Sequence, residues 1–181
     1  MLFCFFTSAT VYSQTDSLVI KSSIDSTNGL RIIPGLGVKG LIEIGKTKKE
    51  NKKTIGKGIK GKEDTWGGCV RVKGHRWAHF IDYPKYGFKA YIDRSKHKKQ
   101  IINYIDFDSS FVGELENGIK IGRTTRKEIY AIYGQKEYHN PAITYSSLGI
   151  GFLFDNDYVI GTPDDILVEI SVFAVKEQDD K

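Results

Sequence analysis

The segment GIKIGRTTRKEIYAIYG, residues 118–134, decides the predicted fold, because a short alternating strand, a turn and a helix follow one another in it. A second segment, LIEIGKTKKENKKTIG at residues 41–56, repeats this pattern once a single residue is removed near the turn. Further along, DYPKYGFKAYID at 82–93 matches TYSSLGIGFLFD at 144–155 without a gap. These matches predict two diverged copies of one unit.

Each copy ends in a further apolar segment, at residues 101–107 in the first and 166–173 in the second. Each copy is therefore expected to contain a strand, a helix and a meander of strands. We predict repeat 1 at residues 30–107 and repeat 2 at residues 113–175. Together they predict an α+β fold whose helices pack on one side of a mostly antiparallel sheet. The total of 181 residues is enough for one compact domain of this kind.

The signals for the ends of the two helices are the same in both copies. Each helix follows a Thr with a Glu three residues later, a capping box in which side chains satisfy free amides. Each helix is followed by a Gly, which can adopt the left-handed conformation that ends a helix. These residues are Thr47, Glu50 and Gly56 in the first copy and Thr125, Glu128 and Gly134 in the second.

The two predicted helices differ in what they can bury. In the second, Ile129, Ile132 and Tyr133 are spaced to form one apolar stripe. In the first, lysines dominate and only Ile55 is left to bury. We therefore expect the first helix to be short, weakly held or frayed.

The repeated patterns resemble a known family. G-[IV]-x-[IL]-G, then T-x-x-E-x-x-x-x-[YFI]-G, then Y-x-x-x-G-[IF]-x-F is similar to the tandem α/β repeat of beta-lactamase inhibitor protein-like and outer-membrane assembly lipoprotein-like (BamE/SmpA) domains. The motif YPKYG at 83–87 resembles most closely uncharacterised secreted proteins of Gram-negative bacteria. The resemblance implies the repeat fold and an exported protein over about residues 30 to 175. It carries over neither the inhibitors' disulfides nor a lipid anchor.

The N-terminus has the outline of an export signal. Residues 1–13, MLFCFFTSATVYS, combine an apolar run with small residues before a predicted cleavage site at Gln14, although a basic start is missing. The alternative is an apolar N-terminal strand. We predict a signal peptide at 1–13, a linker at 14–29, a disordered tail at 176–181, and a secreted or periplasmic location. Cys69 is then the only thiol of the mature chain, so no internal disulfide can form.

One motif indicates nucleotide binding when taken alone. Residues 40–47, GLIEIGKT, satisfy the P-loop pattern G-x-x-x-x-G-K-[ST] and offer Gly45, Lys46 and Thr47 as phosphate and Mg²⁺ contacts. A P-loop, however, needs a strand that ends before its first Gly, whereas LIEI alternates as a strand does and places Glu43 where phosphates would lie. The repeat already explains these residues as a strand end and a helix cap. A small nucleotide-binding protein or hydrolase is therefore the alternative.

Other chemistry is weakly indicated. His75 and His79 have the spacing of a helical zinc pair, but on a strand their separation of about 13 Å is too large for one metal ion. Cys69, His75 and an Asp could be combined as a catalytic set, but no G-x-S-x-G elbow is present. We predict no catalytic residue, no metal and no cofactor.

The charge is distributed unevenly along the chain. The net charge of +5 combines residues 39–100, with 18 Lys and Arg against 6 Asp and Glu, and residues 101–181, with 7 against 14. Aromatic residues lie among the cations of the first copy, a combination that binds anionic polymers, lipid headgroups or acidic proteins. A solvated lysine-rich face, or docking of the oppositely charged halves on each other or on a second copy, explains the same pattern.

The resulting functional hypothesis is a non-enzymatic binding module. Its partner is expected to be a protein or an anionic envelope or extracellular polymer, with nucleic acid disfavoured and no transmembrane span. The predicted contact residues are the aromatic and basic side chains Trp66, Arg71, Lys73, Arg76 and Trp77.

Overall fold

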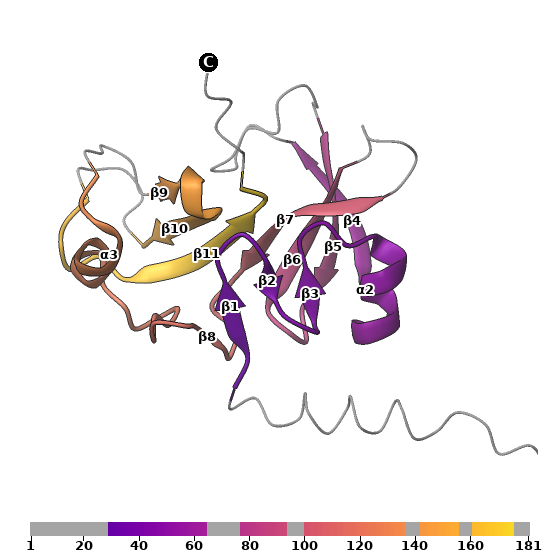
Figure 1. Ribbon diagram of the computed structural model, residues 1–181, viewed down its shortest axis with the longest axis horizontal. Helices are drawn as coiled ribbons and strands as arrows, with labels where there is room; N and C mark the ends of the chain where they lie inside the picture. Colours follow the sequence, from indigo (N-terminus) through magenta and orange to yellow (C-terminus); the bar gives the residue numbers. More distant parts are fainter. Residues whose placement is uncertain (1–28, 65–76, 94–99, 137–141, 156–160, 176–181) are drawn as a thin grey trace, which may run out of the picture.

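The computed structural model describes residues 29–64, 77–93, 100–136, 142–155 and 161–175 (Figure 1). The predicted signal peptide, the predicted tail and all of the linker except its last residue lie outside the described residues. The α+β prediction is confirmed, since the described residues form two α-helices and eleven strands in mostly antiparallel sheets.

The main element is a seven-stranded sheet in which every neighbouring pair is antiparallel. Its strands, in spatial order, are β4 (Ile59–Asp64), β5 (Trp77–Tyr83), β6 (Phe88–Asp93), β7 (Ile101–Phe107), β11 (Leu167–Phe173), β10 (Ile150–Phe154) and β9 (Ala142–Tyr145). A short 3₁₀ turn, η2 (Ser146–Leu148), joins β9 to β10.

A smaller sheet and two helices complete the fold. The small sheet has the order β3 (Ile42–Glu43), β2 (Gly37–Val38), β1 (Arg31–Ile33) and β8 (Glu114–Leu115), and its β1–β8 pair is parallel. The helices are α2 (Lys48–Ile55) and α3 (Arg126–Tyr133). In Figure 1 the two helices lie toward opposite ends of the molecule, with β1, β2 and β3 between them.

One hydrophobic core joins these layers. Ile55 of α2, Ile129 of α3 and Ile42 of the small sheet belong to the same buried cluster as Phe88 and Phe107 of the large sheet. The approach is close at β2, where a Cβ on Gly37 would lie 2.9 Å from the Ile105 side chain. The helices and the small sheet therefore cover the same face of the large sheet.

The two helices have matching surroundings. Beside each helix, the backbone makes three contacts with the start of a long central strand. Two of them are hydrogen bonds, from an amide two or three residues before the N-cap and from the first helical amide, and the third is a β-bridge at the N-cap itself. Three pairs of residues make these contacts beside α2, namely Gly45–Ile102, Thr47–Ile101 and Lys48–Gln100. The pairs beside α3 are Gly122–Leu167, Thr125–Ile166 and Arg126–Asp165.

The central strands β7 and β11 pair in a symmetric register, which is unchanged when the two strands are exchanged. Phe107 lies opposite Ile170, and Ile105 lies opposite Val172. Because residues 105 and 107 correspond to 170 and 172 in the matching contacts above, exchanging the two strands reproduces the same register. Outward from this seam the sheet adds β6 and β5 on one side and β10 and β9 on the other.

The N-cap predictions are confirmed, whereas the predicted left-handed conformation of the two C-cap glycines is wrong. In both helices the N-cap threonine accepts a hydrogen bond from the third helical amide, and the glutamate returns to the threonine amide at 2.7 Å. Both glycines that follow have positive φ, 84° for Gly56 and 86° for Gly134. Their ψ values of −157° and 150° lie outside the left-handed helical region that we predicted. This backbone shape is accessible mainly to glycine.

Two further local predictions are wrong. Residues 118–122 form no strand, because the Ile119 carbonyl accepts a hydrogen bond from Leu115 and closes a turn. Ile132 is 47% exposed, while Tyr130 packs partly against the core in its place. Helix α2 is short, as predicted, with eight residues like α3, and Asn51 is buried in it beside Ile55.

Candidate functional site

The structure does not test whether the predicted contact residues form one binding surface. Trp66, Arg71, Lys73 and Arg76 lie outside the described residues, as do Cys69 and His75. Trp77 is the first residue of β5, and its backbone lies opposite Asp64 of β4. The grouping of these five side chains therefore remains a prediction.

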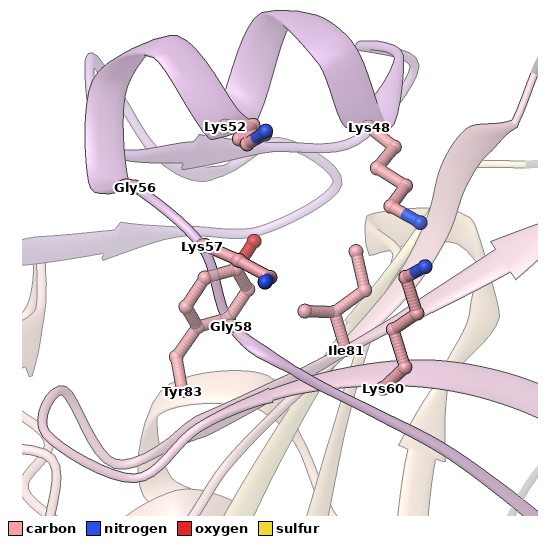
Figure 2. A pocket seen from close by; sticks show the side chains of 8 residues that line it. All are labelled: Lys48, Lys52, Gly56, Lys57, Gly58, Lys60, Ile81 and Tyr83. Carbon is pink, nitrogen blue, oxygen red and sulfur yellow. The ribbon is translucent and has the colours of Figure 1, made fainter.

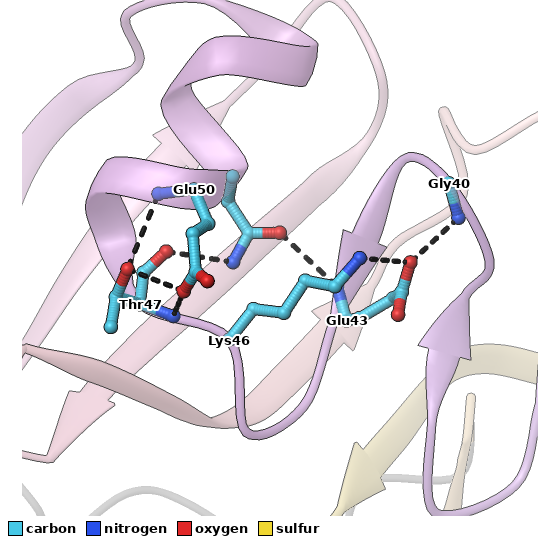
Figure 3. Close-up of polar contacts among 6 residues, drawn as sticks. Gly40, Glu43, Lys46, Thr47 and Glu50 are labelled. Carbon is cyan, nitrogen blue, oxygen red and sulfur yellow. Dashed lines mark hydrogen bonds and ion pairs between the residues drawn. The ribbon is translucent and has the colours of Figure 1, made fainter.

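The P-loop match folds as a strand end and a helix cap (Figure 3). Ile42 and Glu43 form β3 inside the motif. Glu43 accepts hydrogen bonds from the Gly40 amide at 2.8 Å and from the Lys46 ammonium at 2.7 Å. The Thr47 hydroxyl belongs to the capping box with Glu50.

These contacts occupy the groups that a nucleotide would need. The Lys46 bond, followed by the Gly40 amide, lowers the pKa of Glu43, although burial opposes the shift. A charged carboxylate therefore holds the motif lysine at the point where phosphate oxygens would have to lie. The geometry of residues 40–47 favours a structural role.

A cavity lies elsewhere in the first half of the chain, beneath α2 (Figure 2). It has a volume of about 260 Å³, and we call it the lysine pocket. Four of its lining residues are lysines, and none is acidic. The lining residues are Lys48, Lys52, Gly56, Lys57, Gly58, Lys60, Ile81 and Tyr83.

The four cations come from two sides of the lysine pocket. Lys48 and Lys52 are one turn apart on α2, so they share a face of the helix. Lys60 lies directly opposite Ile81 in the β4–β5 ladder, which places both side chains on the same face of the sheet. Figure 2 shows Lys48 and Lys60 extending from opposite walls toward the same space. Within the described residues, Lys52, Lys57 and Lys60 form no ion pair with a carboxylate.

The floor of the lysine pocket is apolar and carries one hydroxyl. Ile81 is 2% exposed and Tyr83 is 5% exposed. The Tyr83 ring points up toward α2 in Figure 2, with its oxygen beside Lys57. That hydroxyl has no hydrogen-bond partner among the residues that the structure describes. Burial raises the pKa of Tyr83, so the hydroxyl stays protonated and can donate.

The space beneath α3 at the matching positions is filled by aromatic side chains. The Tyr133 ring lies 5.1 Å from that of Tyr145 and 5.4 Å from that of Phe152. The Tyr145 hydroxyl donates to the Gly134 carbonyl at 2.6 Å, and Lys136 covers the Tyr145 ring. The matching residues beneath α2 are Ile55, Tyr83, Ala90 and Gly58. Three of these four positions carry smaller side chains, and Gly58 and Tyr83 of this set line the lysine pocket.

The cations at the first positions of the two helices also differ in their surroundings. At the start of α3, Arg126 is buried and pairs with Asp165 at 3.1 Å. At the start of α2, Lys48 lines the lysine pocket. A cation in the first turn opposes the helix dipole, and a second lysine one turn away adds repulsion. The sequence keeps these charges at a cost to the helix, which is typical of positions that serve binding.

The described residues offer little other chemistry. They contain no group of three or more His, Cys, Asp and Glu that could hold a metal ion. Neither of the two described helices has the length and apolar character needed to cross a bilayer. At the β7–β11 seam, buried Tyr104 donates to Ser171, which donates to Asp106 at 2.7 Å. These three side chains join the two central strands.

Sequence reasoning missed the lysine pocket, although it identified the basic half of the chain. The signal was present in the lysines at 48, 52, 57 and 60, two of them spaced by one helical turn. The predicted contact residues are instead the cations near tryptophan, Arg71, Lys73 and Arg76. No family model, no curated protein and no solved structure matches the chain, so the function is argued from the site itself.

Proposed function

We propose that this protein is a non-enzymatic binding module that holds an anionic partner in the lysine pocket of its first repeat. The carrying observation is the convergence of four lysines on a cavity without an acidic lining residue. An anion there would relieve the repulsion between the lysines and hydrogen-bond to the Tyr83 hydroxyl. The excess of cations in residues 39–100 would attract such a partner from a distance.

The proposal includes a tandem architecture. The matching contacts of α2 and α3, and the symmetric register of β7 and β11, support two copies of one unit joined at that seam. The copies would have diverged, so that the first binds while the second is closed by aromatic packing. Kinship with beta-lactamase inhibitor protein-like and BamE/SmpA-like domains, and a secreted or periplasmic location, remain part of this proposal on the sequence patterns alone.

The test compares two variants of equal charge. Lys52→Gln/Lys60→Gln removes two pocket cations, whereas Lys49→Gln/Lys53→Gln removes two cations of α2 that do not line the pocket. We expect the full chain to be retained on heparin at low salt. The pocket variant should elute at clearly lower salt than the control variant, because only it loses the converging charges.

Equal elution of the two variants would show that total charge governs retention and would overturn the proposal. Lack of retention of the unmodified chain would overturn it as well. Thermal unfolding with Mg-ATP tests the nucleotide alternative in parallel. Stabilisation by Mg-ATP that is lost in Lys46→Ala would support the P-loop reading against ours.

A further inference from the structure

We infer that the group bound in the lysine pocket is a pair of adjacent phosphate groups, carried either by a soluble diphosphate or by a lipid headgroup. This inference rests on the proposed function and specifies its ligand. Four properties of the lysine pocket support it: the number of charges, the kind of donor, the form of the floor and the size of the cavity.

The number of charges favours two phosphates. Four lysine ammoniums line the cavity, no carboxylate is among its described lining residues, and Lys52, Lys57 and Lys60 form no ion pair within the described part of the chain. A terminal phosphate group carries about −1.5 to −2 charges at neutral pH, whereas a carboxylate carries −1. Two terminal phosphates together carry about −3 to −4 charges and come close to compensating the lysines, whereas one carboxylate would leave most of the positive charge and one sulfate dianion about half of it.

The kind of donor points the same way. The lysine ammonium is a compact charge with three donors, and it binds phosphate without the fixed fork that arginine offers to planar carboxylates. No arginine lines the pocket. The Tyr83 hydroxyl adds one neutral donor from the floor, which suits a tetrahedral group whose oxygens point in several directions.

The floor and the glycines limit how the ligand lies. Gly58 runs so close to β5 that an added Cβ would lie 2.4 Å from Ile81 and 2.7 Å from the Tyr83 ring. The backbone at this position therefore presents no side chain between the ligand and the floor. A phosphate ester can place its oxygens among the lysines and its carbon atoms on Ile81 and the Tyr83 ring.

The size of the cavity restricts the ligand further. At about 260 Å³ it falls just below the range of roughly 300–1,000 Å³ usual for pockets that enclose a whole drug-sized ligand. It fits a small diphosphate, or the head of a larger molecule whose remainder stays outside.

Titration calorimetry of the full chain at constant ionic strength tests the inference with three probes, namely inorganic pyrophosphate, inorganic phosphate and sulfate. We expect pyrophosphate to bind about tenfold or more tightly than either single anion, because it engages more ammoniums at once. Lys52→Gln/Lys60→Gln should weaken pyrophosphate binding about tenfold or more, and Lys49→Gln/Lys53→Gln less than about twofold. Tyr83→Phe should weaken it several-fold without changing the ring.

Vesicles separate the two sources of paired phosphates. Sedimentation with phosphatidylcholine vesicles, with and without phosphatidylinositol 4,5-bisphosphate, measures binding to a lipid whose headgroup carries two terminal phosphates on neighbouring carbons. Binding that depends on this bisphosphate lipid and that pyrophosphate displaces supports the lipid source. Pyrophosphate binding without vesicle binding supports the soluble source.

Two outcomes would overturn the inference in distinguishable ways. If the heparin test depends on the pocket but pyrophosphate binds no better than sulfate, the paired-phosphate inference is wrong and the proposed function stands. If neither heparin retention nor pyrophosphate binding distinguishes the pocket variant from its control, both are wrong.

Discussion

Replacing Asp165 with Asn is expected to destabilise the protein strongly, because it leaves a buried guanidinium without its counter-ion. Arg126 Nε donates a hydrogen bond to Asp165 Oδ2 at 3.2 Å, and Nη2 lies 3.1 Å from the same oxygen. The two side chains are only 3% and 6% exposed. The guanidinium carbon also lies 4.1 Å above the centre of the Phe154 ring.

The expected cost follows from this burial. Removing one partner of a buried ion pair typically costs about 3–5 kcal/mol, since the remaining charge cannot regain water. Domains of this size have free energies of unfolding of about 5–15 kcal/mol, so the loss is about a fifth of that free energy or more. As a control, Glu114→Gln breaks the exposed pair between Glu114 and Lys120, and it should cost less than about 1 kcal/mol.

Urea unfolding, followed by circular dichroism, measures both variants. The Asp165→Asn midpoint should fall sharply at an unchanged dependence on denaturant, whereas the Glu114→Gln midpoint should barely move. If Asp165→Asn does not fold, Arg126→Met/Asp165→Leu provides the second test, because an apolar pair of similar volume should restore most of the stability. A cost below about 1 kcal/mol for Asp165→Asn would refute the assignment of a buried, mutually dependent pair.

Three further predictions concern the framework. Hydrogen bonds from the Thr125 amide and then from its hydroxyl lower the pKa of Glu128 from its ordinary value of 4.5. The charged cap therefore stabilises the fold above pH 4.5, and this contribution is lost as the pH falls through the folded-state pKa. Urea midpoints of Glu128→Gln should therefore depend less on pH in the acid range, and an unchanged profile would contradict this role. Gly87→Ala should abolish folding, because a Cβ would lie 2.2 Å from the Phe111 amide nitrogen, whereas Gly118→Ala, with open space around it, should cost only about 1–2 kcal/mol in thermal unfolding. Asn51→Ala should cost about 1–3 kcal/mol in urea unfolding, since the Glu43 amide loses its acceptor at 3.3 Å, and a neutral result would contradict that reading.

The parts of the fold that the sequence predicted correctly depend on neighbouring residues. The capping boxes of Thr47 and Thr125 are determined by a glutamate three residues later. The positive φ of Gly56 and Gly134 follows from the position of a glycine directly after a helix. The α+β class followed from alternating strands around these helices.

The predictions that proved wrong depended on contacts that strand alternation and helical spacing do not encode. Ile119 alternates as in a strand, but its carbonyl accepts a hydrogen bond from the Leu115 amide, only four residues away, and closes a turn. Ile132 has the spacing of the apolar stripe but is 47% exposed, and Arg126 ties the start of α3 to Asp165, 39 residues away.

The candidate site shows the same division. The sequence identified the basic half of the chain, since lysines can be counted without a structure. Which lysines converge depends on the β4–β5 register, which sets Lys60 opposite Ile81 and brings Tyr83 beneath α2. That register joins residues about 20 positions apart, and local alternation does not specify it.

The most direct test of the lysine pocket observes each lysine separately. In the full chain with ¹³C-labelled lysine ε-carbons, assigned through single Lys→Arg variants, addition of pyrophosphate should shift the signals of Lys52, Lys57 and Lys60 in a saturable way. The signals of Lys49 and Lys53, on the same helix but outside the pocket, should stay nearly unchanged. Shifts of equal size in all five signals would show diffuse attraction to a basic surface and would contradict the account.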